Sequence, residues 1–281
     1  MPLDLSRLGV CSWSLQVGSV PELAGLLPQV GVDLVQIACG DPHHASWAEG
    51  DAMPAAARAA GFRLGGAMLG FPGEDYTSPA TIQRTGGFGD PSTRPERLDR
   101  LRWAVARTRE LGLTDLMFHA GFLPEPGDPG RRAFLDTLTT AASVASEQGV
   151  RIAFETGQET ADLLHRTLTD LALPNVGVNF DPANMLLYDM GDPLAAVEKL
   201  APYIRTVHLK DGNRPTVPGE WGSEVPVGTG QTDSAAFLAT LDRVGYAGPV
   251  FVEREVGDQP ARVRDIAHAV GFVRSWAATR G

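Results

Sequence analysis

Short apolar segments alternate with longer amphipathic segments along the whole of this 281-residue chain. Several of the short segments are rich in Val, Ile and Phe, and we predict eight strands at residues 8–15, 32–39, 63–69, 115–120, 150–156, 176–181, 204–209 and 249–253. Apolar residues at helical spacing predict eight helices at residues 21–30, 52–60, 95–111, 130–148, 160–171, 193–203, 234–244 and 259–278. Strict alternation favours a parallel sheet with helical crossovers, and eight such units close into a barrel. The sequence therefore predicts an α/β fold, a single-domain (β/α)8 TIM barrel over residues 1–281.

The charge and the cysteine content exclude several classes of function. With 24 basic and 34 acidic side chains the formal net charge is −10, whereas a surface that binds nucleic acid needs an excess of basic residues. The two cysteines, Cys11 and Cys39, are too few for a disulfide scaffold or a thiolate zinc cluster. No apolar stretch reaches the ~18 residues of a membrane span, and no signal peptide is visible. We therefore expect a cytoplasmic protein with neither nucleic acid nor membrane as a partner.

Ionisable side chains stand at the ends of the last four predicted strands, although barrel strands are buried on both faces and should be apolar. The four residues are Glu155, Asp181, His208 and Glu253. Since strand side chains alternate between faces, one at the end of each strand can point into the barrel mouth. Three carboxylates that converge there would raise one another's pKa, and a divalent cation removes that conflict. Three oxygen ligands and one imidazole suit Mn²⁺ or Mg²⁺, and they also accept Co²⁺ or Zn²⁺.

The segments around these residues carry a family resemblance. They are Phe154-Glu155-Thr156, Asn179-Phe180-Asp181-Pro182-Ala183-Asn184, Val207-His208-Leu209-Lys210-Asp211, Pro226-Val227-Gly228-Thr229-Gly230, and Gly245-Tyr246-Ala247-Gly248-Pro249 leading to Val252-Glu253. Through them the chain resembles the sugar phosphate isomerase/epimerase group of the xylose isomerase-like TIM barrel superfamily, which includes tagatose 3-epimerase, hydroxypyruvate isomerase and inosose dehydratase. The resemblance is close over the C-terminal half and limited to element order in the N-terminal half. It implies that Glu155, Asp181, His208 and Glu253 ligate one divalent metal ion.

The resemblance further implies a divalent-metal-dependent isomerase or epimerase of a small keto-sugar or sugar phosphate. Glu155 and Glu253 would be the acid/base pair on opposite faces of this carbohydrate substrate. A metal chelated by a carbonyl and its neighbouring hydroxyl acidifies the adjacent C–H and stabilises the enediolate that forms. One carboxylate removes the proton, and the second returns it with inversion, or to the neighbouring carbon in an isomerase. Expulsion of a β-hydroxyl gives a lyase instead, so an inosose-type dehydratase or a keto-sugar eliminase is the alternative.

Two further functions are less favoured. An abasic-site endonuclease shares the fold, but it needs additional histidines, and the third predicted strand ends Ala67-Met68-Leu69 without one. A non-catalytic sugar-binding barrel would be expected to have lost a ligand or one of the two glutamates, and this chain keeps them all. Barrels of this kind often pair, so a homodimer or homotetramer is compatible with the sequence.

Five further residues are expected to contact the substrate: Trp13, His119, Asn184, Lys210 and Arg214. Trp13 and His119 close predicted strands, and Lys210 has the same alternation parity as His208. The resemblance places Asn184 where the tagatose epimerases carry a His, and Arg214 where they carry an Arg that grips substrate oxygens. A second Glu of those epimerases is replaced here by Ala161. These departures leave the identity of the sugar and its phosphorylation undetermined.

Two long connections, residues 71–94 and 210–232, follow predicted strands on the face where such barrels place their active sites. We expect both to act as lids over a bound substrate. The second contains Trp221, and its Gly228 and Gly230 could offer backbone N–H groups to a phosphate.

Three more polar residues lie in or near the second predicted strand. Gln36 is within it, and because an unpaired buried amide would be costly, we expect its side chain to serve the site. His43 and His44 follow in a loop and are expected to be solvated.

Overall fold

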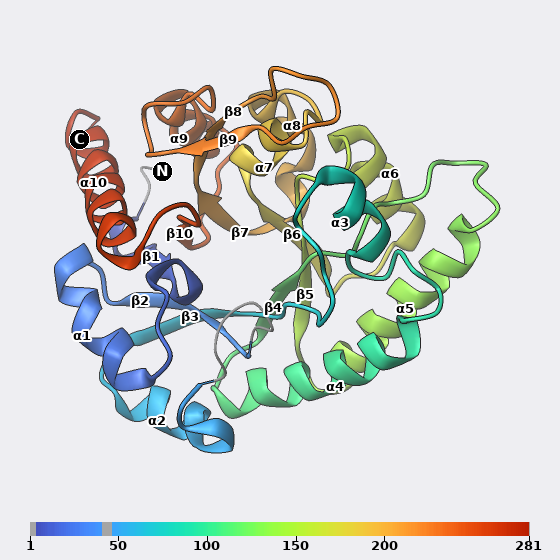
Figure 1. Cartoon of the computed structure of the whole chain (residues 1–281), viewed down its shortest axis with the longest axis horizontal. Coiled ribbons are helices and arrows are strands. Elements are labelled where there is room, and N and C mark those ends of the chain that lie inside the picture. The colour runs from blue at the N-terminus through green and yellow to red at the C-terminus, as the bar shows by residue number, and fades with distance from the viewer. Residues whose placement is uncertain (1–3, 41–46, 281) are drawn as a thin grey trace.

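Residues 4–40 and 47–280, which the computed structural model describes, form a closed barrel of eight parallel strands (Figure 1). Around the barrel the strands follow the order β1-β10-β7-β6-β5-β4-β3-β2. Their bounds are β1 (Leu8–Cys11), β2 (Leu34–Ala38), β3 (Arg63–Met68), β4 (Asp115–Phe118), β5 (Arg151–Glu155), β6 (Val176–Phe180), β7 (Ile204–Leu209) and β10 (Val250–Val252). The ring closes where β10 pairs with β1 through Val250 and Leu8. The predicted single-domain (β/α)8 barrel is confirmed.

Helices surround the strands and cover the outer face of the barrel (Figure 1). All eight predicted helices are present in the described residues: α1 (Val20–Val30), α2 (Met53–Ala59), α4 (Arg94–Glu110), α5 (Arg131–Glu147), α6 (Ala161–Leu171), α8 (Pro193–Leu200), α9 (Ser234–Arg243) and α10 (Gln259–Ala278). Several begin at a side-chain cap; Asp258, for example, accepts the N–H of Ala261 at 3.0 Å. Within the described ranges, every helix falls short of the combined length and hydropathy that a membrane span requires.

The first predicted strand is too long. β1 ends at Cys11, and Ser12–Leu15 form a 3₁₀ helix that turns away from the strand. The Ser12 hydroxyl accepts the N–H of Ala38 at 3.0 Å, so a side chain replaces the backbone partner that a longer strand would supply. An apolar run does not distinguish these two conformations, because the side chains of both are buried here.

Both long connections contain secondary structure that the sequence analysis did not predict. In the described residues these elements are α3 (Pro79–Thr85), β8 (Asp211–Asn213) and β9 (Ser223–Val225), and α7 (Pro182–Leu187) is a further helix outside the two connections that was not predicted. α3 lies in the connection after β3, where Ser78 and Thr81 form a capping box. β8 and β9 form an antiparallel hairpin in the connection after β7. α7 follows β6 directly.

Side chains fill the interior of the barrel below the mouth. An inner cluster of buried residues consists of Cys11, Trp13, Leu34, Ala38, Met68, Met117, Ala153 and Phe251. Gly9 and Gly65 make room for this cluster, because a Cβ on either would lie 2.9 Å from a ring atom of Phe251. Because side chains fill the interior, it has no room for a substrate. A binding site must therefore lie outside one end of the barrel.

Candidate active site

The four predicted metal ligands meet at the end of the barrel where the strands terminate. Glu155 is the last residue of β5, and His208 lies in β7. Asp181 and Glu253 directly follow β6 and β10. All four are buried, and each offers one ligand atom that lies within 4.8 Å of the others. The structure therefore brings all four together at one centre.

His208 lies in the middle of this cluster. Its Nδ1 is 2.9 Å from Glu155 Oε1 and 3.3 Å from Glu253 Oε2. Asp181 Oδ2 lies 3.8 Å from the same nitrogen. On the other side of the ring, Nε2 donates to Gln36 Oε1 at 2.7 Å. Because a carbonyl oxygen can only accept, Gln36 fixes the proton on Nε2 and leaves Nδ1 directed at the carboxylates.

Two atoms of the cluster, Asp181 Oδ2 and His208 Nδ1, are buried without an aligned hydrogen bond among the described residues. The other Asp181 oxygen, Oδ1, caps α7 by accepting the N–H of Asn184 at 2.9 Å. Buried polar atoms without partners are costly, and carboxylates this close repel one another. A divalent cation at the centre would satisfy both atoms and balance the charge, and this oxygen-rich donor set suits one. The residues present therefore fit a metal ion.

Trp13 and Lys210 hold the two oxygens of Glu253. Trp13 Nε1 donates to Oε1 at 2.6 Å, and Lys210 Nζ donates to Oε2 at 2.9 Å. Burial alone would raise the pKa of Glu253, but Lys210 and His208 beside it hold that pKa well below its usual range. Glu253 is therefore an ionised carboxylate that two donors fix in place.

His119 and Asn184 hold Glu155. His119 Nε2 lies 3.0 Å from Oε2, and Asn184 Nδ2 donates to Oε1 at 3.4 Å. Burial alone would raise the pKa of Glu155, but His119 and His208 together lower it to about 2. Burial likewise opposes a charge on His119, yet Glu155 and Glu74 raise its pKa to about 9. The pair is an ionised carboxylate beside a protonated imidazole.

Lys210 is 2 % exposed and is surrounded by acidic side chains. Besides Glu253, its Nζ donates to Glu255 Oε2 at 2.5 Å, and Glu224 Oε2 lies 3.7 Å away. Arg254 donates to the other oxygen of Glu224 at 2.7 Å. This network ties β9 to the end of β10. Lys210 was predicted from the sequence to contact the substrate. Glu224 and Glu255 were not predicted, because they lie in connections without a periodic signal.

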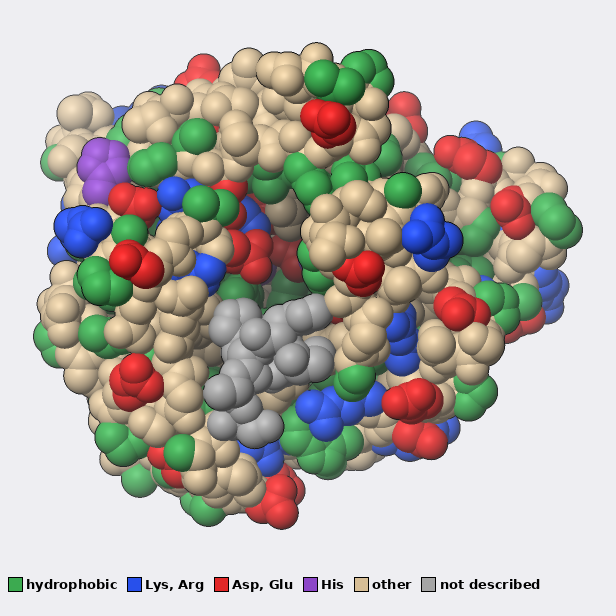
Figure 2. All heavy atoms as spheres, in the orientation of Figure 1, with side chains coloured by type: hydrophobic (Ala, Val, Ile, Leu, Met, Phe, Trp, Pro, Cys, Tyr) green, Lys and Arg blue, Asp and Glu red, His purple; other side chains and the backbone are tan. Residues whose placement is uncertain are grey.

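A cavity of about 520 Å³ opens above the cluster at the barrel mouth. Figure 2 shows a hollow in this face that holds acidic and basic side chains, with hydrophobic side chains along its edge. Trp13, His119, Asn184 and Lys210, which were predicted to contact the substrate, all line the cavity. Glu74 and Tyr188 line it too, and no sequence signal identified them.

Arg214, the fifth predicted substrate contact, is not among the residues that line the cavity. Its Nη1 donates to Asp189 Oδ1 at 2.6 Å, and its guanidinium also donates to the Gly191 carbonyl. Contact with substrate would therefore require the guanidinium to leave Asp189 when the substrate binds.

We expect Arg214→Ala to raise KM about tenfold without loss of metal, since a charge-assisted hydrogen bond is worth about 1.5–3 kcal/mol. Steady-state kinetics combined with metal analysis measures both quantities. Arg243→Ala is the matched control, because Arg243 is also exposed and paired with an acidic side chain, Glu198. Kinetic constants of Arg214→Ala within about twofold of the parent would contradict both the contact and the lid closure that it supports.

The Asp211 side chain holds together the two ends of the connection between β7 and α9. It is fully buried, and its Oδ2 accepts the N–H groups of Gly228 at 2.9 Å and Gly230 at 3.0 Å. These two groups are therefore not available to a phosphate, and the expectation that they bind one is wrong. His43 and His44 lie outside the described residues.

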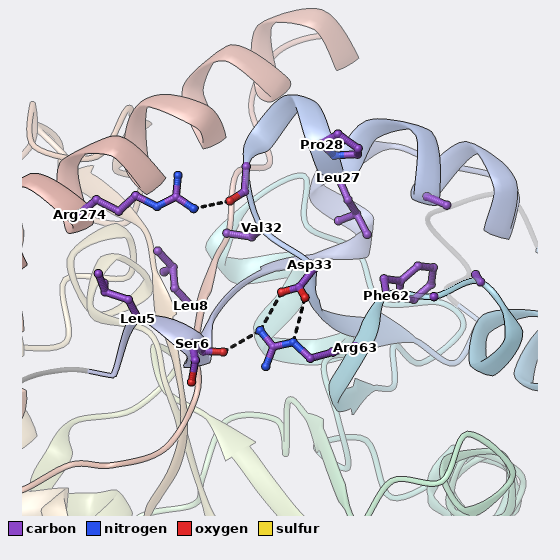
Figure 3. Close-up of a pocket in the computed structure, with 14 residues that line it drawn as sticks. Leu5, Ser6, Leu8, Leu27, Pro28, Val32, Asp33, Phe62, Arg63 and Arg274 are labelled. Carbon is purple, nitrogen blue, oxygen red and sulfur yellow. Dashed lines mark hydrogen bonds and ion pairs between the residues drawn. The ribbon is translucent and has the colours of Figure 1, made fainter.

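A second cavity, of about 510 Å³, lies at the opposite end of the barrel, where β1, β2 and β3 begin (Figure 3). Its ionisable side chains already have partners. Arg63 pairs with Asp33 at 2.7 Å, and Arg274 of α10 donates to the Gly31 carbonyl. The buried cluster of Glu155, Asp181, His208 and Glu253 is at the mouth, so the mouth is the candidate active site.

A model of the xylose isomerase-like TIM barrel family matches residues 26–276 of this chain. A ketose 3-epimerase from Arthrobacter globiformis is 26% identical over 203 residues, which cover 67% of this chain and 65% of the epimerase. The chain thus spans just under two thirds of the length of that curated relative.

Two solved structures are similar over nearly their whole length. A xylose isomerase domain protein from Planctomyces limnophilus is 31% identical, with a TM-score of 0.84 and coverage of 98% of this chain and 97% of that one. A xylose isomerase-like TIM barrel protein from Mycobacterium smegmatis, in complex with magnesium, is 16% identical, with a TM-score of 0.67 and coverage of 92% and 89%. At that identity the second likeness shows the fold alone.

Proposed function

The chain belongs to the xylose isomerase-like TIM barrel family, and we propose that it is a divalent-metal-dependent isomerase or epimerase of a small keto-sugar. One observation carries the proposal: four ligand atoms of Glu155, Asp181, His208 and Glu253 lie within 4.8 Å of one another beneath a cavity. The ketose 3-epimerase relative supports a sugar with a carbonyl group as the substrate.

The metal ion would be held by these four side chains, with Nδ1 as the ligand atom of His208. An ion bound there polarises a substrate carbonyl and stabilises the negative charge that develops on its oxygen. Mg²⁺ or Mn²⁺ suits a set of three carboxylates better than a softer ion does, and the magnesium complex of the Mycobacterium smegmatis protein is consistent with that choice.

Glu155 and Glu253 would move the protons. They come from β5 and β10, which are separated by β6 and β7 around the barrel, so they face a bound substrate from different sides. Both are ionised, which allows either to accept a proton from the carbon beside the carbonyl. Glu253 would accept that proton, while Glu155 would take a proton from the adjacent His119 and deliver it to the opposite face; exchange with solvent would then return His119 and Glu253 to their starting states. His119, Asn184, Trp13 and Lys210 hold the two carboxylates in position through the contacts described above.

The proposal is tested by metal loading followed by isotope exchange. The full chain is stripped with a chelator and reloaded separately with Mg²⁺, Mn²⁺, Co²⁺ or Zn²⁺, and metal content is measured. A panel of keto-sugars and inososes is then incubated in heavy water, and products are identified by mass spectrometry and NMR.

We expect one ion per chain and metal-dependent uptake of deuterium beside the carbonyl, with epimerised or isomerised product. Loss of water or of a glycosidic group would replace this proposal with the lyase alternative. Bound metal without exchange into any compound of the panel would contradict an enzymatic function of this site.

A further inference from the structure

The cavity at the mouth extends well beyond the metal-binding cluster. Its volume of about 520 Å³ lies in the range of cavities that bury a drug-sized ligand. Glu155 and Glu253, with His119, Asn184 and Lys210 that hold them, form what we call its floor. The remaining wall is mostly apolar, with Met68, Leu69, Met117, Phe118, Leu187, Tyr188, Trp221 and Val256 among its residues. A substrate that fills this cavity therefore meets polar groups at the floor and a largely apolar lining elsewhere.

Four of these residues form what we call the rim shelf: Leu187, Tyr188, Trp221 and Val256. The Tyr188 and Trp221 rings lie 4.7 Å apart and pack edge to face. Val256 lines the same cavity and is 50% exposed. The shelf thus offers an accessible apolar surface next to the floor.

The rim shelf is already assembled in this structure. Gly222, which follows Trp221, donates its N–H to the Leu187 carbonyl at 3.1 Å. A Cβ on Gly222 would lie 2.2 Å from the Asn213 carbonyl oxygen, so only glycine lets this segment approach the hairpin and α7 so closely. The shelf is therefore a preformed surface, and a ligand bound to it has little ordering cost to overcome.

Few polar side chains are available to bind a long row of hydroxyl groups. Asn184 is the only Ser, Thr, Asn, Gln or Arg side chain among the described residues that line the cavity. Glu224 and Glu255 are engaged with Arg254 and Lys210. The rim shelf has only the Tyr188 hydroxyl and the Trp221 Nε1 as side-chain hydrogen-bonding groups, so a substrate end that lies on it gains more from apolar contact than from a row of hydroxyls.

An anionic group is disfavoured in the same cavity. Five carboxylates line it, from Glu74, Glu155, Glu224, Glu253 and Glu255. Lys210 is the only Lys or Arg among its described lining residues, and its ammonium group already bonds two of those carboxylates. Since His119 is likewise paired with Glu155, a phosphate or a second carboxylate on the substrate would find no unpaired cationic side chain among the described residues that line the cavity.

We propose that the substrate is an uncharged keto-sugar that carries an apolar substituent, such as a glycoside whose ring carbonyl is distinct from its anomeric carbon and whose aglycone is aromatic or aliphatic. The sugar carbonyl lies over the floor, and the substituent lies on the rim shelf, with Trp221 and Tyr188 as its main contacts. This inference rests on the function proposed above and names the class of substrate for that site.

The test uses the metal-loaded full chain and four forms of one 3-keto-aldohexose, whose ring carbonyl stays free when the anomeric carbon is glycosylated: the free sugar, its methyl glycoside, its phenyl glycoside and its 6-phosphate. Deuterium uptake from heavy water gives kcat/KM for each. We expect kcat/KM for the phenyl glycoside to exceed that for the free sugar by about tenfold or more. We expect kcat/KM for the 6-phosphate to be about tenfold lower than for the free sugar. These are the factors typical of a substituent that fits, or does not fit, the pocket it enters.

Trp221→Ala should lower the ratio of kcat/KM for phenyl glycoside over free sugar by about tenfold, and Trp221→Phe should restore most of it. Trp276→Ala is the control, since Trp276 lies near the end of α10 beside Arg280 and should leave the ratio unchanged. Metal content and thermal melting of each variant report on folding.

Equal kcat/KM for glycoside and free sugar, an unchanged ratio in Trp221→Ala, or preference for the 6-phosphate would each overturn the inference while leaving the proposed function intact. Absence of exchange with all four sugars, despite bound metal, would instead count against the proposed function, and the inference would fall with it.

Discussion

Replacing Glu253 or Glu155 with Gln should lower kcat by about 10²–10⁴-fold, because an amide keeps the shape of the side chain and one ligand oxygen but cannot carry a proton between carbons. Metal content should fall much less than activity. Steady-state kinetics, exchange in heavy water and metal analysis on the same preparations separate the two effects. Glu198→Gln is a control for the substitution itself, since Glu198 pairs with Arg243 on the surface.

The surroundings of Glu253 require a second variant. Both of its oxygens accept hydrogen bonds, one from Trp13 Nε1 and the other from Lys210 Nζ. The NH₂ group of a Gln side chain would therefore point at one of these donors, and neither donor group would have an acceptor. Such a mismatch costs about 1–3 kcal/mol of folding stability. Adding Trp13→Phe to Glu253→Gln removes one donor and should restore melting temperature but not turnover. Full recovery of turnover with excess metal in either glutamate variant would contradict the acid/base assignment.

The proximity of the four proposed metal ligands could be predicted from the sequence because parallel barrel strands all end on one face. Glu155, Asp181, His208 and Glu253 each interrupt an apolar strand at its C-terminal end, and topology alone then brings them together. Gln36 was identified by the same reasoning, since a polar residue inside a buried strand needs a partner. Its bond to His208 joins residues 172 positions apart, and only the closure of the barrel creates it.

The rest of the site could not be predicted, because it depends on how irregular connections pack. Glu224 reaches the cavity only because the β8–β9 hairpin folds back over the mouth, and so does Trp221, for which the sequence predicted a place in a lid but no contact. Neither residue has a periodic pattern around it. α7, by contrast, has a local signal that was overlooked: Asp181 followed by Pro182 is an N-terminal cap with proline at the first helical position.

Asp181 thus has two separable roles, and this permits a sharp test of the metal centre. Oδ1 caps α7 through the N–H of Asn184, whereas Oδ2 has no hydrogen-bond partner among the described residues and faces His208. An asparagine side chain can still accept the capping bond, but it removes the charge that binds a cation. Asp181→Asn therefore isolates the metal-binding role. Asp181→Ala removes both roles and should cost about 1 kcal/mol more in stability.

We expect Asp181→Asn to weaken metal binding by about 100-fold or more, since even residues that only support a ligand contribute 10–100-fold. Calorimetric titration measures the affinity, and activity is followed against metal concentration. Saturating metal should restore a large part of kcat, because Glu155 and Glu253 are intact and still carry the protons. Asp192→Asn is the matched control: Asp192 caps α8 ahead of a proline in the same way and is exposed. Unchanged metal affinity in Asp181→Asn, or a loss of activity that saturating metal does not relieve, would mean that Asp181 is not a metal ligand and that the centre must be assigned differently.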